Sequence, residues 1–194
     1  CSWMVSCNKN MLMSNRKAAK IIANIQKKYN TSDNTSDNTS DSSTKPKPIN
    51  CCCTDVTGFG LLGHLIEMLK YDDENEQHTG PLPAAQLQLS KIPMLLGATE
   101  CIKQGVYSTL HPQNIRCKRA IEQNNTNNYK LISKTLEFPL LFDPQTSGGL
   151  LCTVPECYAN EVINALKCAN YIDSCVIGTI VPRKEIDICI YLEE

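Results

Sequence analysis

The side chain best suited to chemistry in this sequence is the carboxylate of Asp55, which lies where a short β-branched run meets a glycine-containing turn. Gly58 and Gly60 allow that turn to bend tightly and to approach a ligand closely. A helix is expected directly after it, and helix N-termini direct backbone N–H groups toward anions such as phosphate. Because Mg²⁺ takes one or two carboxylates together with substrate phosphates, this stretch is typical of a magnesium–phosphate site.

The same residues also suit a purely structural role. Asp and Thr are common helix N-caps, because their side-chain oxygens accept hydrogen bonds from the first backbone amides of a helix. Asp55 and Thr57 would then cap the helix and bind no ligand. Short motifs match by chance often enough that the pattern alone leaves both interpretations open.

A second polar loop, Gln145-Thr146-Ser147-Gly148-Gly149, stands between two apolar runs. Successive backbone amides in such a loop can form a concavity that binds anions, and the two glycines permit close approach of the backbone. The loop holds no chemically strong side chain. It is therefore either an edge of a ligand site or a structural turn.

Twelve cysteines are scattered from Cys1 to Cys189 without a C-x-x-C pair. In a strand, only Cys51 and Cys53 of the run Cys51-Cys52-Cys53 would share a face, and two ligands do not complete a zinc site. We therefore expect the cysteines to behave as small buried hydrophobic side chains. The alternative is a redox-active or selenium-handling thiol.

Hydrophobic spacing predicts the elements that position these groups. Strands are expected up to Asp55 and over five later ranges, which are 85–89, 136–142, 150–154, 174–180 and 186–192. Helices are expected over 3–29, 61–69, 98–104 and 156–167, with Gly105 at a left-handed C-terminal cap. This order predicts the α/β class, with a mixed β-sheet and helices packed against it.

Length and composition predict one well-buried domain with some sequence left over, since the chain has 194 residues of which 42% are hydrophobic. The formal net charge of −1 gives no indication of binding to nucleic acid or to an anionic membrane. No apolar run is long enough to span a bilayer. Residues 30–48 form a low-complexity segment with no apolar side chain, which predicts a disordered insertion. A second Asn-rich loop is expected over 124–128. The first residue is Cys1 and not Met, so we expect a piece of a longer protein.

The chain resembles the C-terminal domain of selenophosphate synthetase (selenide, water dikinase) in four ordered segments. These are MSNRKAA at 13–19, TDVTGFGLLGHL at 54–65, SKIPMLLGA at 90–98 and FDPQTSGGLL at 142–151. The likeness continues more loosely through 110–116 and at Ile177-Gly178. The fold it implies is that of the C-terminal domain of aminoimidazole ribonucleotide synthetase-like proteins, over residues 1–194.

That resemblance implies an enzyme that makes selenophosphate, AMP and phosphate from ATP, selenide and water, with Mg²⁺ as cofactor. Asp55 matches the family's metal ligand, and the phosphate side of the nucleotide would be contacted by residues of the two loops: Thr54, Thr57, Gly58, Thr146, Ser147, Gly148 and Gly149. The family's reactive cysteine or selenocysteine and its lysine lie in an N-terminal catalytic domain outside these 194 residues. No residue here is therefore expected to be catalytic, and this piece alone is expected to be inactive.

Other expectations follow from the same resemblance. The full-length protein would be a cytoplasmic homodimer, assembled mainly through the N-terminal domain. Two alternatives stay open. One is another ATP-using enzyme of the superfamily, such as aminoimidazole ribonucleotide synthetase, a thiamine-phosphate kinase or a hydrogenase-maturation protein, against which the complete DPQTSGGLL run argues. The other is a paralogue that binds nucleotide without turning it over.

Replacing residues 30–48 with a short Gly/Ser linker should lower the free energy of unfolding by no more than about 1 kcal/mol. The reason is that loop-closure entropy depends only weakly on length, and the segment has no apolar side chain to bury. Urea unfolding of both proteins measures this. A large drop in stability would mean that the segment packs against the domain.

Overall fold

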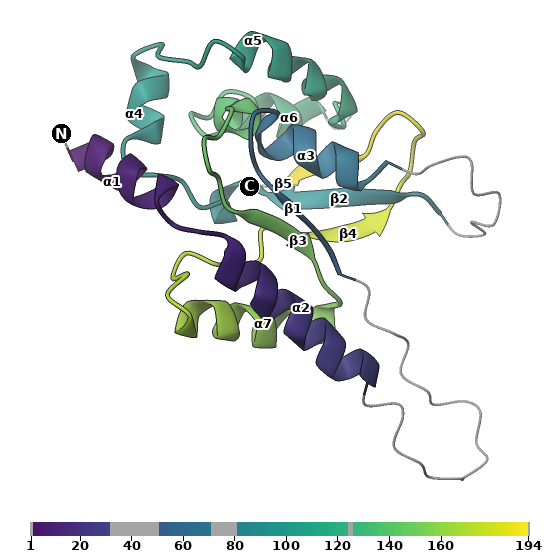
Figure 1. Ribbon diagram of the computed structural model, residues 1–194. Helices are drawn as coiled ribbons and strands as arrows, with labels where there is room; N and C mark the ends of the chain where they lie inside the picture. The colour runs from purple at the N-terminus through teal and green to yellow at the C-terminus, as the bar shows by residue number, and fades with distance from the viewer. Residues whose placement is uncertain (1, 32–50, 71–80, 124–125, 194) are drawn as a thin grey trace.

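The computed structural model describes residues 2–31, 51–70, 81–123 and 126–193 (Figure 1). The predicted insertion over 30–48 falls outside these residues, except that Asn30 and Thr31 end a helix. The helices and strands of the described residues follow in this order: α1 Ser2–Met11, α2 Arg16–Thr31, β1 Cys52–Asp55, α3 Gly60–Met68, β2 Pro83–Gln88, η2 Leu89–Lys91, α4 Ala98–Lys103, α5 His111–Asn114, η3 Ile115–Ala120, α6 Thr126–Ile132, η4 Phe138–Phe142, β3 Leu150–Thr153, α7 Glu156–Cys168, β4 Gly178–Pro182 and β5 Ile190–Glu193.

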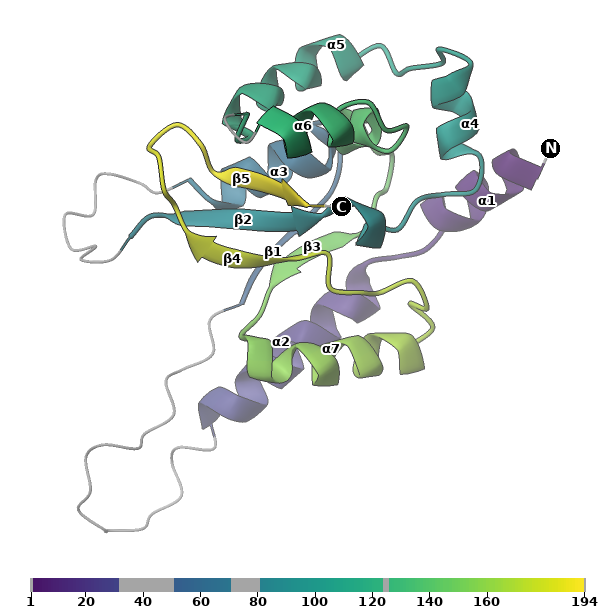
Figure 2. The ribbon, with the colours of Figure 1, turned by 180° about the vertical axis from the view of Figure 1, so that it is seen from behind.

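The described strands form two small sheets. β1 pairs with β3 in antiparallel fashion, and a three-stranded sheet has the order β4-β2-β5. Within the latter, β2 is antiparallel to β4 and parallel to β5. Helices lie on either side of the strands, as the two opposite views show (Figure 2). The predicted α/β class with a mixed sheet and packed helices is confirmed.

The larger core lies between α3, the three-stranded sheet and η4. Leu62 and Leu65 of α3 are almost fully buried, because residues three and four apart share one face of a helix. They pack in one cluster with Ile190 of β5 and Phe142 of η4. This cluster fixes the start of α3, and with it the turn that follows β1.

A second, smaller core lies under the β1–β3 pair. Helices α2 and α7 pack side by side there (Figure 1). Their buried side chains are Ala18 and Ile22 from α2 and Val162 and Leu166 from α7. Partly buried side chains in and next to the two strands, including Cys152 of β3 and Cys51 just before β1, pack against this cluster.

The prediction of a single helix over 3–29 is wrong. The structure has two helices there, α1 and α2, and the helical conformation is interrupted between them. Ser14 Oγ accepts a hydrogen bond from the Arg16 amide at 3.2 Å, a local bond that competes with continuous helix. Asn15 donates its side-chain amide to Gly148 O at 2.8 Å. A long-range contact therefore shapes the break.

The strand expected over 136–142 is also wrong, because Phe138–Phe142 forms a 3₁₀ helix. Its buried residues, Phe138, Leu141 and Phe142, follow helical spacing, and Pro139 lies in its first turn. A short apolar run does not by itself distinguish strand from buried helix. The Asn-rich loop expected over 124–128 is interrupted in the same way, since α6 begins at Thr126.

The remaining predicted elements exist, with shifted ends for the last two strands, which are Gly178–Pro182 and Ile190–Glu193. Gly105 has φ +70, as expected of a left-handed cap. The burial expected for the cysteines is wrong, because Cys189 alone is buried among the described ones. Several of the others lie on the small β1–β3 sheet or on the outer face of α7, where little covers them.

Candidate functional site

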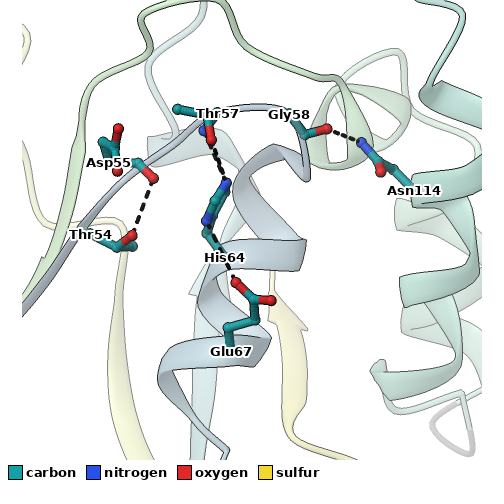
Figure 3. A network of polar contacts seen from close by, with 7 residues as sticks. All are labelled: Thr54, Asp55, Thr57, Gly58, His64, Glu67 and Asn114. Atoms are coloured by element: carbon teal, nitrogen blue, oxygen red, sulfur yellow. Dashed lines mark hydrogen bonds and ion pairs between the residues drawn. The ribbon is translucent and has the colours of Figure 1, made fainter.

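His64 of α3 holds the turn that follows β1 in place (Figure 3). The Thr57 amide donates to His64 Nε2 at 3.0 Å, and the Thr57 hydroxyl oxygen lies 3.1 Å from the same nitrogen. Because Nε2 accepts the amide hydrogen, the ring proton of neutral His64 belongs on Nδ1, which lies 3.9 Å from Glu67 Oε2. The buried His64 side chain therefore connects the turn to α3 by a hydrogen bond.

The capping interpretation of Asp55 and Thr57 is wrong. α3 begins at Gly60, its N-cap residue is Phe59, and no side chain caps it. Asp55 is instead the last residue of β1, and its side chain is exposed. Within the described ranges, the Asp55 carboxylate accepts no hydrogen bond and forms no ion pair, and Figure 3 shows it turned away from its neighbours.

The second predicted loop docks directly on this turn. The Gln145 amide donates to Thr57 O at 3.0 Å, and the Val56 amide donates to Gly149 O at 2.9 Å. A Cβ at Gly148 would lie 2.2 Å from Val56 O, so only glycine fits there. Ser147 has φ +53, a left-handed conformation that costs energy for a residue with a side chain. Tertiary contacts therefore hold the loop in one conformation.

Two asparagines fasten the assembly to the rest of the molecule. Asn114 of α5 donates to Gly58 O at 2.8 Å and to Phe142 O at 3.0 Å (Figure 3). Asn15 donates its side-chain amide to Gly148 O of the second loop. The roles of His64, Asn114 and Asn15 were missed from the sequence. The available signal was a polar side chain inside each of the segments that carry the family resemblance.

The structure brings all the predicted site residues together at one end of the paired strands β1 and β3, where β1 ends and β3 begins. Thr54 and Asp55 are the last two residues of β1, and Thr57 and Gly58 lie in the turn after it. The Thr54 hydroxyl lies 3.3 Å from the Asp55 carbonyl oxygen. In the second loop Gly148 is buried, whereas Thr146, Ser147 and Gly149 are exposed. The backbone amides of Gly58 and Phe59 have no acceptor among the described residues.

No group of three or more His, Cys, Asp or Glu side chains gathers tightly enough for a metal in the parts of the chain that the structure describes. Asp55 is an exposed carboxylate with open coordination capacity, which suits Mg²⁺ when phosphates supply further oxygen ligands. The residues present therefore fit one part of a magnesium site and need the ligands of another molecule or domain.

A pocket of about 430 Å³ opens nearby, between the start of α2 and the end of α7. Its lining includes the basic residues Arg16, Lys17 and Lys20, and none of the predicted site residues. This pocket is therefore separate from the predicted site.

Residues 47–190 match the family described as "AIR synthase related protein, C-terminal domain". The chain belongs to this family. Curated relatives in it are named selenide, water dikinase, and the predicted resemblance to the C-terminal part of that enzyme is confirmed. No described helix is long and apolar enough to cross a membrane.

Three of these relatives show the extent of the likeness. The protein of Clostridioides difficile (strain 630) is 31% identical over 141 residues, which cover 68% of this chain and 34% of the relative. That of Agathobacter rectalis is 32% identical over 139 residues, covering 70% and 35%. That of Myxococcus xanthus (strain DK1622) is 31% identical over 136 residues, covering 66% and 32%. The chain therefore spans about a third of the length of the curated relatives it matches.

Gly148→Ala should lower the free energy of unfolding by about 1–3 kcal/mol, because the added methyl group overlaps Val56 O. Gly149→Ala is the matched control, since a Cβ there meets nothing within 4 Å. Urea unfolding compares the two variants with the wild type. Equal stability of the two variants would contradict the close approach of loop and turn.

Asp143→Asn should stabilise the protein at neutral pH. Burial raises the pKa of the Asp143 carboxyl above its ordinary value of 3.8, and the nearby His111 opposes the shift. Because the folded pKa lies above the unfolded one, the charged carboxylate lowers stability as pH rises through the folded pKa. The gain from Asn should therefore be present at about pH 7 and vanish below the ordinary value of 3.8.

Urea unfolding of wild type and Asp143→Asn across this pH range measures the effect. The exposed Asp187→Asn serves as the control for adding an amide at an aspartate position. A gain that stays constant with pH would assign the stabilisation to some cause other than ionisation.

Proposed function

We propose that this chain is the C-terminal domain of an ATP-dependent selenophosphate synthetase, which converts ATP, selenide and water to selenophosphate, AMP and phosphate. The relatives' shared name supports the reaction. The single observation that carries the site is the Asp55 carboxylate, which is exposed at a strand end and free of any described partner. A carboxylate that caps no helix and forms no ion pair is available for a ligand.

Mg²⁺ at this position would neutralise phosphate oxygens during phosphoryl transfer. Asp55 would hold the ion, and the open amides of Gly58 and Phe59 would face phosphate oxygens from the same turn. Thr146 and Ser147 would offer exposed hydroxyls from the docked loop. Thr54, Gly148 and Gly149 would complete this wall of the nucleotide site, chiefly through the backbone.

The buried polar residues of the chain would act by positioning. His64 orients Thr57, so that the turn presents its next two amides outward. Asn114 holds Gly58 O and Phe142 O together, which keeps the turn against the larger core. Positioned dipoles stabilise developing charge without reorganising, which is the main contribution proteins make to phosphoryl transfer.

A further domain would supply the reactive cysteine or selenocysteine and its lysine, and this domain would also form most of a homodimer interface. Helix α1 supports this proposal. Every residue of α1 is described, and none is buried. Its large apolar side chains are exposed to solvent: Met4 is 66% exposed, Val5 68% and Trp3 37%. A ten-residue helix is marginal alone in water and usually depends on a packed apolar face. The catalytic domain would cover these exposed apolar side chains.

Asp55→Asn in the full-length enzyme should lower Mg²⁺-dependent AMP formation by about 100-fold or more, because even residues that only support metal ligands cost 10–100-fold. Raising Mg²⁺ should restore part of the activity by mass action on the weakened site. The melting temperature should hardly change, since the side chain has no described partner to lose.

Asp187→Asn, at another exposed aspartate, is the matched control and should keep full activity. Near-normal activity of Asp55→Asn with unchanged Mg²⁺ dependence would contradict the proposed metal-binding role of Asp55. Selenide-dependent AMP release by the isolated 194 residues would instead contradict the need for a further domain.

A further inference from the structure

The pairing of β1 with β3 sets two thiols directly opposite one another. Cys53 is the register partner of Cys152, and side chains of directly opposed residues project from the same face of a sheet. Both cysteines are free thiols. Neither belongs to the segments that suggested a nucleotide site.

The position of this pair in the hydrogen-bonding ladder favours close approach. The Val56 amide donates to Gly149 O at 2.9 Å, which makes Val56 and Gly149 a hydrogen-bonded pair in the same register. Hydrogen-bonded and non-hydrogen-bonded pairs alternate along antiparallel strands. Cys53 and Cys152 therefore occupy a non-hydrogen-bonded position, where the Cα atoms are about 4.5 Å apart and the side chains are closest.

We propose that Cys53 and Cys152 are a redox-modification site, at which a small-molecule disulfide such as oxidised glutathione converts the two thiols to a cross-strand disulfide. A Cα separation of about 4.5 Å lies within the range of about 4.4–6.8 Å that disulfides span. This inference is independent of the proposed enzymatic function.

The neighbouring cysteines, Cys51 and Cys52, are less well placed than Cys53 to form a disulfide with Cys152. Cys51 lies before β1 and has no register partner in β3, whereas Cys53 lies directly opposite Cys152. Cys52 points to the opposite face and has Thr153 as its partner. The fold thus selects one pair from a run of three adjacent cysteines.

The surroundings set the order and the speed of the reaction. Cys53 is exposed, whereas Cys152 is half-buried against the α2–α7 cluster, so an oxidant meets Cys53 first. Burial raises the pKa of the Cys152 thiol to about 11, with Cys53 and Cys51 adding to the shift. Little Cys152 thiolate is present at neutral pH, so the second step, in which Cys152 closes the disulfide, is slow.

The chemistry balances with one oxidant molecule. The Cys53 thiolate attacks a sulfur of the glutathione disulfide, a mixed disulfide forms and one glutathione thiolate leaves. The Cys152 thiolate then attacks the Cys53 sulfur and expels the second glutathione. The two thiol protons go to the leaving thiolates, so two protein thiols and one oxidised glutathione yield one protein disulfide and two reduced glutathiones.

The experiment equilibrates the native 194-residue protein in glutathione redox buffers, blocks the remaining thiols and maps cross-linked peptides by mass spectrometry. The Cys53–Cys152 peptide should be the most abundant cross-link in the wild type and in Cys51→Ser and Cys52→Ser. It should be absent from Cys53→Ser and Cys152→Ser. In urea it should fall to the level of the other cysteine pairs, because the folded register specifies it.

A second readout is thermal stability. The cross-link joins residues about 100 positions apart and restricts the unfolded chain, so oxidation should raise the melting temperature of the wild type by several degrees. Neither Cys53→Ser nor Cys152→Ser should show this rise. The proposal is overturned if the native protein at equilibrium forms the Cys53–Cys152 bond no more often than Cys51–Cys152. It is also overturned if the bond forms without raising the melting temperature.

Discussion

The carbonyl of Val56 runs so close past Gly148 that a single methyl group on that glycine would come within 2.2 Å of the oxygen. Around this contact, the Thr57 carbonyl accepts from both Gln145 and Gly60, and the Val56 amide donates to Gly149 O. Backbone from two distant parts of the chain is therefore joined without intervening side chains. Where Asp55 lies, and how its turn faces solvent, depends on this junction.

Besides apolar packing, polar side chains connect that junction to the two cores. His64 and Asn114 are buried and hydrogen-bonded to the turn, and they belong to elements of the larger core. Asn15 reaches Gly148 from the start of α2, which packs in the smaller core. A buried polar group left without its partner costs about 1–3 kcal/mol. Each of these bonds is consequently specific about geometry, whereas apolar packing alone tolerates small displacements.

Local patterns predicted the parts of the structure that depend on local physics. The apolar spacing around Leu62 and Leu65 predicted α3, and the glycines predicted the turn, because helix periodicity and backbone freedom are properties of a short segment. The contact between Val56 and Gly149 is long-range and leaves no such signal. The apolar run at 138–142 was assigned wrongly because strand and buried 3₁₀ helix share its composition. The exposure of Asp55 likewise became evident only once its neighbours were in place.

The strand pairings also determine when in its synthesis the chain can fold. The position of Asp55 is fixed only after β3, nearly 100 residues later, has been synthesised. Likewise, β2 has no strand to pair with at either edge until β4 and β5 have been synthesised. Contacts this distant carry a high loop-closure entropy and form slowly. Until residues 178–193 emerge from the ribosome, β2 has two open edges available to other chains. The risk of aggregation is accordingly highest in the nascent chain just before residues 178–193 appear.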